Sequence, residues 1–304
     1  MPELVPVCIL CSSLDYVEDH GATFYLNLPE PFEVVQCPSC GLRWLNPRPT
    51  EEEYDEIYTE AYYRNCPEGA PTSEWGRLFP PPPQDYERET VLYRRVAWEG
   101  RLASLESLLL AKGSILDVGA GTGDFLALAR ERGWTVWGIE KSEYACQQAQ
   151  EKYGLVLESP AMDHLARSGR QFDVVHLSHV FEHFTCPQEI LAKLRHLMHP
   201  RSLLVIEVPN QFRSWVQVVR DWRDVTRQRV RSLWSIHHPY FYGREQLLRL
   251  LAQSGFEVLA VRTYFPDRWK AGWQKRIGGV VEHIGDRLGG HGDNIEAIAR
   301  LEAD

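Results

Sequence analysis

The sequence lacks long hydrophobic runs and has no excess of positive charge. No stretch approaches the roughly 20 apolar residues that a membrane-spanning helix needs. The 304 residues include 33 lysines and arginines against 42 aspartates and glutamates, a formal net charge of -9. This balance argues against a protein that coats nucleic acid or an anionic membrane. The first residues also lack the basic start and apolar core of a secretory signal, so we expect a cytoplasmic protein with no membrane span.

Cysteine is scarce and unevenly placed. Four of the seven cysteines form two close pairs, Cys8 with Cys11 and Cys37 with Cys40. An odd count with this spacing argues against a disulfide framework, whereas two C-x-x-C pairs supply four thiolates for tetrahedral zinc. A redox C-x-x-C is the alternative, but it leaves the second pair unexplained. We expect a structural zinc ion that does no chemistry, and whose removal unfolds only about the first 45 residues.

Prolines and composition divide the chain into parts. The four consecutive prolines at 80–83 exclude a helix interior or a central strand, so they indicate a linker. The expected parts are a zinc-ribbon module (1–45), a tyrosine- and proline-rich connection (46–83), a core domain (84–265) with an insertion or lid (211–240), and a C-terminal helical extension (266–304).

The core domain alternates between strand-like and helix-like segments. Its strand-like runs are apolar nearly throughout, which is typical of parallel strands buried on both faces. The expected strands are 114–119, 135–140, 172–178 and 203–210, and the expected helices are 84–110, 124–132, 142–153, 187–198 and 244–253. This order predicts a doubly wound, mostly parallel α/β sheet of the Rossmann-like kind.

A glycine-rich loop follows the first of these strands. The run DVGAGTG places Gly119, Gly121 and Gly123 between strand and helix, with the acids Asp117 and Asp124 beside them. A dinucleotide-binding loop has the spacing G-x-G-x-x-G and rests a pyrophosphate on the helix N-terminus, where these carboxylates would repel it. Carboxylates suit a ligand that carries an ammonium and a sulfonium group. We therefore expect S-adenosylmethionine (SAM), with NAD as the alternative.

Further residues fit the same cofactor. Glu140 ends the next strand, where an acidic side chain can accept hydrogen bonds from both ribose hydroxyls. After it, Ala161 and Met162 offer an apolar wall for adenine, and Asp163 lies nearby.

Residues 112–265 resemble the class I SAM-dependent methyltransferases. The resemblance rests on ILDVGAGTGDFL, WGIEKS, FDVVHLSHVFEHF, VIEVPN and GFEVL, in this order. It implies a seven-stranded type of sheet and SAM bound by Asp117, the three loop glycines and Glu140. It also implies that the loop around Ser178 and His179 closes over the cofactor. The chain departs from the family at Arg201 and Ser202, where a Pro-Gly-Gly turn is usual, and its last antiparallel strand is not found after residue 265.

The run CPSCGLRWLNPRPTEEEYDEIYTEAYYRN is similar to the leader of zinc-ribbon methyltransferases associated with sugar or polysaccharide modification. This resemblance suggests that Tyr62 and Tyr63 approach the mouth of the active site. Packing or surface tyrosines are the alternative.

Histidines supply the candidate bases. The run HVFEH at 179–183 matches a zinc-protease motif, but that chemistry needs a stable helix, and too little chain separates the preceding strand from Pro187. A methyltransferase that acts on a hydroxyl must remove its proton, and histidine suits that task. His238 is the first candidate and His183 the second.

The segment before His238 is rich in arginine. Between residues 213 and 231 there are six arginines against two aspartates. Guanidinium groups bind phosphate or carboxylate, so an anionic acceptor such as a nucleotide sugar could dock on this segment, unless it is simply a solvated helix face. The leading hypothesis is a SAM-dependent methyltransferase with a small-molecule or glycan-like acceptor. The alternatives are a zinc-ribbon RNA methyltransferase and a non-catalytic SAM-fold binding protein.

Overall fold

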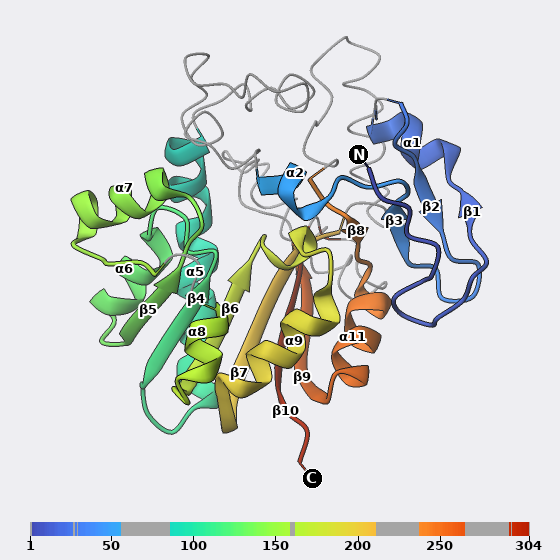
Figure 1. Ribbon diagram of the computed structural model, residues 1–304. Coiled ribbons are helices and arrows are strands. Elements are labelled where there is room, and N and C mark those ends of the chain that lie inside the picture. Colours follow the sequence, from blue (N-terminus) through green and yellow to red (C-terminus); the bar gives the residue numbers. More distant parts are fainter. Residues whose placement is uncertain are drawn as a thin grey trace, which may run out of the picture.

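The chain forms two β-sheets, one of them covered by helices on both faces (Figure 1). The computed structural model describes residues 2–26, 28, 30–55, 86–158, 162–210, 237–264, 292 and 294–303. Within these ranges, the larger sheet has six strands in the order β5-β4-β6-β7-β10-β9, and the smaller has four in the order β1-β2-β3-β8. None of the helices in these ranges is long and apolar enough to cross a membrane.

The larger sheet is the expected Rossmann-like sheet. Its strands are β4 (Ser114–Val118), β5 (Thr135–Ile139), β6 (Phe172–Ser178), β7 (Met198–Pro209), β9 (Phe256–Tyr264) and β10 (Asn294–Leu301). The first four pair in parallel, as their uninterrupted apolar sequences predict. β10 runs antiparallel to both of its neighbours, β7 and β9.

β10 corrects one expectation from the sequence. Residues 294–301 belong to a strand between two others rather than to a C-terminal helical extension. They also supply the antiparallel strand that the sequence did not reveal. Pairing on both sides buries this strand along most of its length, which outweighs the local preference of its residues.

Helices cover both faces of the larger sheet (Figure 1). On one face lie α5 (Tyr86–Leu108), α6 (Asp124–Glu131) and α7 (Glu143–Tyr153), and on the other lie α8 (Met162–Arg167), α9 (Pro187–His196) and α11 (Arg244–Gln253). Successive side chains of a strand point to opposite faces. Val174 and Val205 accordingly pack with the first group of helices, and Val175 and Ile206 with the second.

The smaller sheet forms most of the cysteine-containing module. Its strands are β1 (Val17–Glu18), β2 (Val34–Gln36), β3 (Arg43–Leu45) and β8 (Tyr240–Phe241), with α1 (His20–Leu26) against them and α2 (Glu51–Asp55) following. α2 begins at a capping box, in which Thr50 and Glu53 each bond to the other's backbone N–H. The fourth strand comes from far along the chain, because Trp44 pairs with Tyr240.

The module packs directly against the core domain. The Gln246 amide on α11 donates to the Cys40 carbonyl at 2.7 Å, and Gln188 on α9 donates to the Ile9 carbonyl at 2.6 Å. Arg48 donates to the Thr185 carbonyl at 2.8 Å. The buried apolar cluster on the α8, α9 and α11 face also includes residues of the module, namely Cys8, Leu10, Val35, Cys37, Leu42 and Trp44. The module thus shares its apolar core with the domain that follows it.

Candidate active site

The candidate site lies along one edge of the larger sheet. β4, β5, β6 and β7 are parallel, so their carboxyl ends meet at this edge (Figure 1). The glycine loop follows β4, Glu140 follows β5, and the histidine-containing loop 179–183 follows β6. In open α/β sheets, ligands bind in the crevice beyond the carboxyl ends of the strands.

The glycines of the loop have different neighbours. Gly119 and Gly121 have φ angles of 74° and 55°, a region that disfavours other residues. A Cβ at Gly119 would lie 2.4 Å from a methyl carbon of Val180, so this glycine lets the loop after β6 approach closely. A Cβ at Gly121 would meet no heavy atom of the described chain within 4 Å. The described chain therefore leaves space for a ligand on the side of Gly121 where a side chain would lie.

Glu140 is fixed against the glycine loop. One carboxylate oxygen accepts the Gly121 N–H at 2.7 Å, and the other accepts the amides of Lys141 and Ser142, both at 2.8 Å. Burial raises the pKa of this carboxyl above its ordinary value, against the opposing effect of the three amides. The structure therefore brings Glu140 and the loop together, as the sequence predicts.

Asp117 and Asp124 are held by protein groups. Asp124 accepts hydrogen bonds from the Thr122 hydroxyl at 2.5 Å and the Tyr153 hydroxyl at 2.6 Å. Asp117 is buried, with its carboxylate 2.6 Å from Nδ1 of His176. Both carboxylates lie beside the glycine loop, and Asp117 is also the first member of a buried network.

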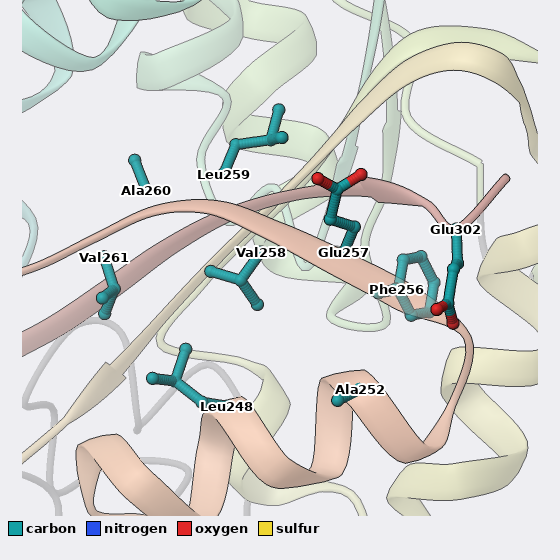
Figure 2. Close-up of a pocket in the computed structure, with 9 residues that line it drawn as sticks. All are labelled: Leu248, Ala252, Phe256, Glu257, Val258, Leu259, Ala260, Val261 and Glu302. Atoms are coloured by element: carbon teal, nitrogen blue, oxygen red, sulfur yellow. The ribbon is translucent and has the colours of Figure 1, made fainter.

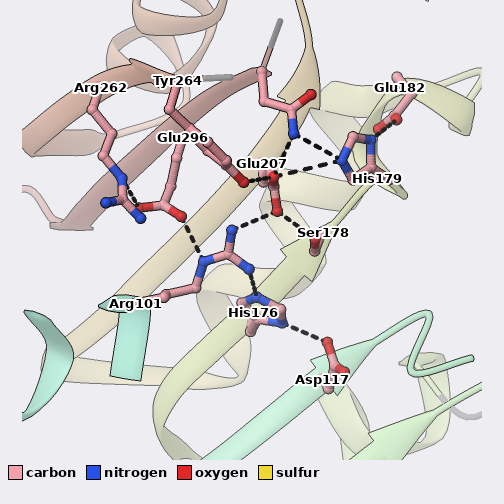
Figure 3. Close-up of polar contacts among 11 residues, drawn as sticks. Arg101, Asp117, His176, Ser178, His179, Glu182, Glu207, Arg262, Tyr264 and Glu296 are labelled. Carbon is pink, nitrogen blue, oxygen red and sulfur yellow. Dashed lines mark hydrogen bonds and ion pairs between the residues drawn. The ribbon is translucent and has the colours of Figure 1, made fainter. Parts of the chain in front are cut away.

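Arg101 is the centre of this network (Figure 3). Its guanidinium, on α5, is fully buried and bonds to Glu296 at 2.6 Å, Glu207 at 2.5 Å and Nε2 of His176 at 2.8 Å. A guanidinium can only donate, so Nε2 of His176 accepts and Nδ1 carries the proton that is donated to Asp117. The network connects α5 to the end of β4 and fixes the tautomer of this histidine.

Besides Arg101, the Glu207 carboxylate also contacts residues at the end of β6 and in the loop that follows it. The Glu207 carboxylate accepts hydrogen bonds from Ser178 at 2.5 Å, from Asn294 at 2.9 Å and from the Tyr264 hydroxyl, and Nε2 of His179 lies 3.5 Å from it. Ser178 and His179, both predicted from the sequence, are thus held by one acid that the sequence did not single out.

Two predicted catalytic histidines lie together around a buried acid. The rings of His183 and His238 are 4.7 Å apart between centroids, at an interplanar angle of 73°. The Glu182 carboxylate lies 4.0 Å from Nε2 of each. Burial lowers the pKa of His183 and holds that of His238 well below its usual range, and burial and His183 lower the pKa of neighbouring His237 to about 3. These imidazoles are neutral near pH 7.

The protease motif does not form its usual geometry. Phe181–His183 is a single 3-10 turn, η1, and His179 precedes it with a φ angle of 56°. The two histidines of the motif are therefore not on one face of an α-helix, as expected from the short distance to Pro187.

The four cysteines also lie together. The sulfurs of Cys8 and Cys40 are 3.5 Å apart, and so are those of Cys11 and Cys37. A zinc ion with Zn–S bonds of about 2.3 Å would hold its four sulfurs about 3.8 Å apart, so the thiols fit a tetrahedral site after a small adjustment. The group could hold one metal ion.

The remaining predicted residues lie either in another environment or outside the described residues. Met162 begins α8 and packs against the buried apolar cluster on the α8, α9 and α11 face, whereas Ala161 lies outside the described residues. So do Tyr62, Tyr63 and the arginine-rich segment.

A separate groove lies between α11 and β9 (Figure 2). Leu248, Val258 and Val261 are among its apolar lining residues, and two glutamates are its charged ones. Among the described residues that line it there is no histidine or cysteine, and the lining is mainly apolar. It is not part of the site at the strand ends.

Comparisons with known proteins agree with this architecture. Residues 92–261 match a family model described as a methyltransferase domain. A SAM-dependent methyltransferase from Archaeoglobus fulgidus is 22% identical, with a TM-score of 0.50 over 71% of this chain and 100% of that one. The plantazolicin methyltransferase BamL, solved with a triazolic desmethylPZN analog and SAH, is 17% identical, with a TM-score of 0.54 over 84% of this chain and 97% of that one.

The plantazolicin methyltransferase BpumL, solved with SAH, is 16% identical, with a TM-score of 0.53 over 83% of this chain and 97% of that one. No curated protein matches the chain. At these identities the solved structures share the fold. The family model covers more than half of the chain, and the chain therefore belongs to the methyltransferase domain family and is a SAM-dependent methyltransferase.

Proposed function

We propose that this methyltransferase acts on a small-molecule or glycan-like acceptor, and that the acceptor is anionic, as a nucleotide sugar is. The structural observation that supports one site for methyl transfer is the contact between the two halves of that site. Val180 packs against Gly119, which places the loop bearing Glu182 and His183 directly beside the glycine loop. When bound, SAM supplies an electrophilic methyl group on a sulfonium centre.

The cofactor half of the site is assigned to the strand-end residues. Gly121 leaves space for a ligand, and Glu140 holds a carboxylate next to it. Asp117 adds negative charge below the loop, and burial makes such a charge more effective toward a cation. The full proposed set is Asp117, Gly119, Gly121, Gly123, Glu140, Ala161, Met162, Ser178 and His179.

His238 is the proposed proton acceptor and His183 the second candidate. His238 is buried and His183 is partly buried, and with their pKa values lowered both imidazoles are neutral, so each can accept a proton from an acceptor hydroxyl. His238 lies in the short segment that leads into β8, and His183 ends the turn η1. Two elements distant in sequence thus present their imidazoles to one place.

The acceptor class rests on the sequence. The leader of the chain is similar to that of sugar-modifying methyltransferases, and the arginine-rich segment, 213–231, precedes the proposed base. BamL was solved with a triazolic desmethylPZN analog, so compounds of that kind form a second arm of the test.

The four cysteines are proposed to hold zinc. Their sulfur separations of 3.5 Å support a tetrahedral thiolate site, and four protein ligands leave no position for a substrate. The ion would therefore stabilise the module rather than take part in methyl transfer.

Incubation with methyl-labelled SAM tests the proposed function. Candidate nucleotide sugars, the triazolic desmethylPZN analog and RNA are offered in parallel, and products are identified by mass spectrometry. We expect label on a nucleotide sugar. Label on RNA alone, with binding that falls steeply with salt, would overturn the acceptor class.

Calorimetry with SAM tests the cofactor site separately. We expect Asp117→Ala and Glu140→Ala each to weaken SAM binding, and unchanged affinity in both variants would show that the site is misplaced.

A further inference from the structure

We propose that Glu182, His183 and His238 form a second metal site, for a divalent transition-metal ion. The Glu182 side chain is 2% exposed, and neither of its carboxylate oxygens accepts a hydrogen bond from a residue that the structure describes. Its nearest basic atom is Nδ1 of His179, at 3.6 Å. A buried carboxylate without hydrogen bonds is strongly disfavoured, and a bound cation removes that penalty.

The histidines present the right atoms to this carboxylate. Nδ1 of His183 lies 2.8 Å from the carbonyl oxygen of His237, which can only accept, so Nδ1 carries the proton and Nε2 carries the lone pair. Hydrogen bonding of the remote ring nitrogen to a carbonyl is how proteins orient a metal-ligating histidine. Nε2 of His183 then faces Glu182 across 4.0 Å, a distance too long for a hydrogen bond.

The spacing of the three donors fits a metal ion after a small movement. One atom from each of Glu182, His183 and His238 lies within 4.8 Å of the other two. Ligands about 2.1 Å from a tetrahedral ion are about 3.4 Å apart, so the separations of 4.0 Å must shorten by about half an ångström. Small side-chain rotations achieve such a shift.

The donor types select the metal. Two imidazoles and one carboxylate suit zinc, iron, cobalt or manganese, whereas magnesium and calcium prefer oxygen ligands alone. Three protein ligands leave coordination positions open, unlike the four cysteines. The site is also unlike the zinc-protease arrangement, because its third donor is His238 from the segment before β8 rather than His179 from the motif.

The position of the ion gives it a role in acceptor binding. Val180, two residues before Glu182, packs on the glycine loop, so an acceptor oxygen at an open position of the ion would lie beside the cofactor site. This role rests on the proposed function. With the ion bound, His183 and His238 are its ligands, and their role as direct proton acceptors applies only to the metal-free site. Metal binding itself depends on neither SAM nor acceptor.

Stepwise cobalt loading of the full-length, metal-free protein tests the site. We expect two ions per chain. The first gives intense sulfur-to-cobalt charge-transfer bands from the four cysteines, and the second adds only the weak bands of nitrogen and oxygen ligands. Glu182→Gln and His238→Asn should weaken the second ion by roughly tenfold or more and leave the first unchanged. His196→Asn, an exposed histidine on α9, is the matched control and should bind both ions.

One cobalt ion per chain in the unmodified protein would overturn the proposal, even if the variants failed to fold. So would a second ion with unchanged affinity in folded Glu182→Gln. The proposed function is judged apart from this result. Two bound ions without methyl transfer to any acceptor would support the metal site and contradict the proposed function. Methyl transfer with a single bound ion would support the proposed function and contradict the metal site.

Discussion

Arg101 connects a helix to three strands through one side chain. Its guanidinium bonds to His176 on β6, Glu207 on β7 and Glu296 on β10. Two carboxylates and one guanidinium are together buried, and each has its partners. Removing this cation alone would leave Glu207 without its guanidinium partner and Glu296 with only Arg262, close to the loop residues that Glu207 holds.

Replacing Arg101 should therefore destabilise the fold strongly. We expect Arg101→Met to lower the free energy of unfolding by about 3–5 kcal/mol, because it leaves the buried Glu207 carboxylate without its guanidinium partner. Urea unfolding followed by fluorescence measures the loss. Arg95→Met is the matched control on the same helix, since Arg95 is half-exposed in its ion pair with Glu99 and should change stability by about 1 kcal/mol or less. Equal losses in the two variants would contradict the expectation.

The acid partner of Arg101 should make stability depend on pH. Burial alone would raise the pKa of Glu207, but the Arg101 guanidinium outweighs it and holds the pKa well below the usual range. A lowered folded-state pKa contributes stability that is complete above the unfolded pKa, about 4.3, and that is lost as pH falls through the lower folded value.

Glu207→Gln isolates this contribution. We expect the difference in unfolding free energy between the protein and Glu207→Gln to stay constant above about pH 5 and to shrink below about pH 4. Urea titrations at stepped pH measure it. A difference that stays constant down to about pH 2 would show that Glu207 does not titrate with folding.

At the scale of the elements, the glycine loop needs glycine for two reasons: its backbone has positive φ angles, and a side chain would fill the space proposed for the cofactor. Gly121 and Gly154 both have positive φ angles, 55° and 63°, and at both a Cβ would meet no described atom within 4 Å. Only Gly121 lies in the candidate cofactor site, whereas Gly154 ends α7. The pair therefore separates backbone strain from the loss of ligand contact.

Substituting each glycine by alanine tests this separation. Gly121→Ala and Gly154→Ala should each lower stability by about 1 kcal/mol, because alanine tolerates this backbone region poorly. We expect only Gly121→Ala to weaken SAM binding, as measured by calorimetry, because its methyl group occupies the space that a cofactor needs. Equal SAM affinity in both variants would place the cofactor elsewhere.

The elements also show what a sequence alone can predict. Parallel strands and their helices were predictable because burial on both faces leaves continuous apolar runs. β10 was not, because alanine, glutamate, arginine and leucine favour helices locally, and only its two neighbouring strands make NIEAIARL extended. The glycine loop and the histidines could be predicted because each is a short motif within one stretch of sequence. The Arg101 network could not be predicted in this way, because the partners of Arg101 are 75 to 195 residues away in the sequence. The helix that carries Arg101 was predicted from its apolar residues alone.

At the scale of the whole molecule, the cysteine module and the core domain share one apolar cluster. Cys8, Cys37 and Trp44 pack in the same cluster as Leu247 on α11, and the Gln246 amide bonds to Cys40. The expectation that metal loss unfolds only the first 45 residues takes no account of this packing. Disrupting the proposed zinc site should instead weaken the core domain as well.

A cysteine variant tests this coupling. We expect Cys40→Ser to lower the midpoint of a single thermal transition that fluorescence and circular dichroism report alike, because the two parts unfold together. Cys146→Ser, outside the module, is the control and should leave that midpoint nearly unchanged. Two separate transitions in Cys40→Ser, with the later one at the original temperature, would show that the core domain is independent.

The pairing of Trp44 with Tyr240 has a consequence for protein engineering. The strand that completes the module's sheet follows His237 and His238 almost immediately, so those imidazoles are anchored on the very structure that the cysteines organise. A chimera that exchanged the amino-terminal module between two such enzymes, while keeping the original segment around Tyr240, would join mismatched strands and misplace both histidines. Module and histidine segment must be transplanted as one piece.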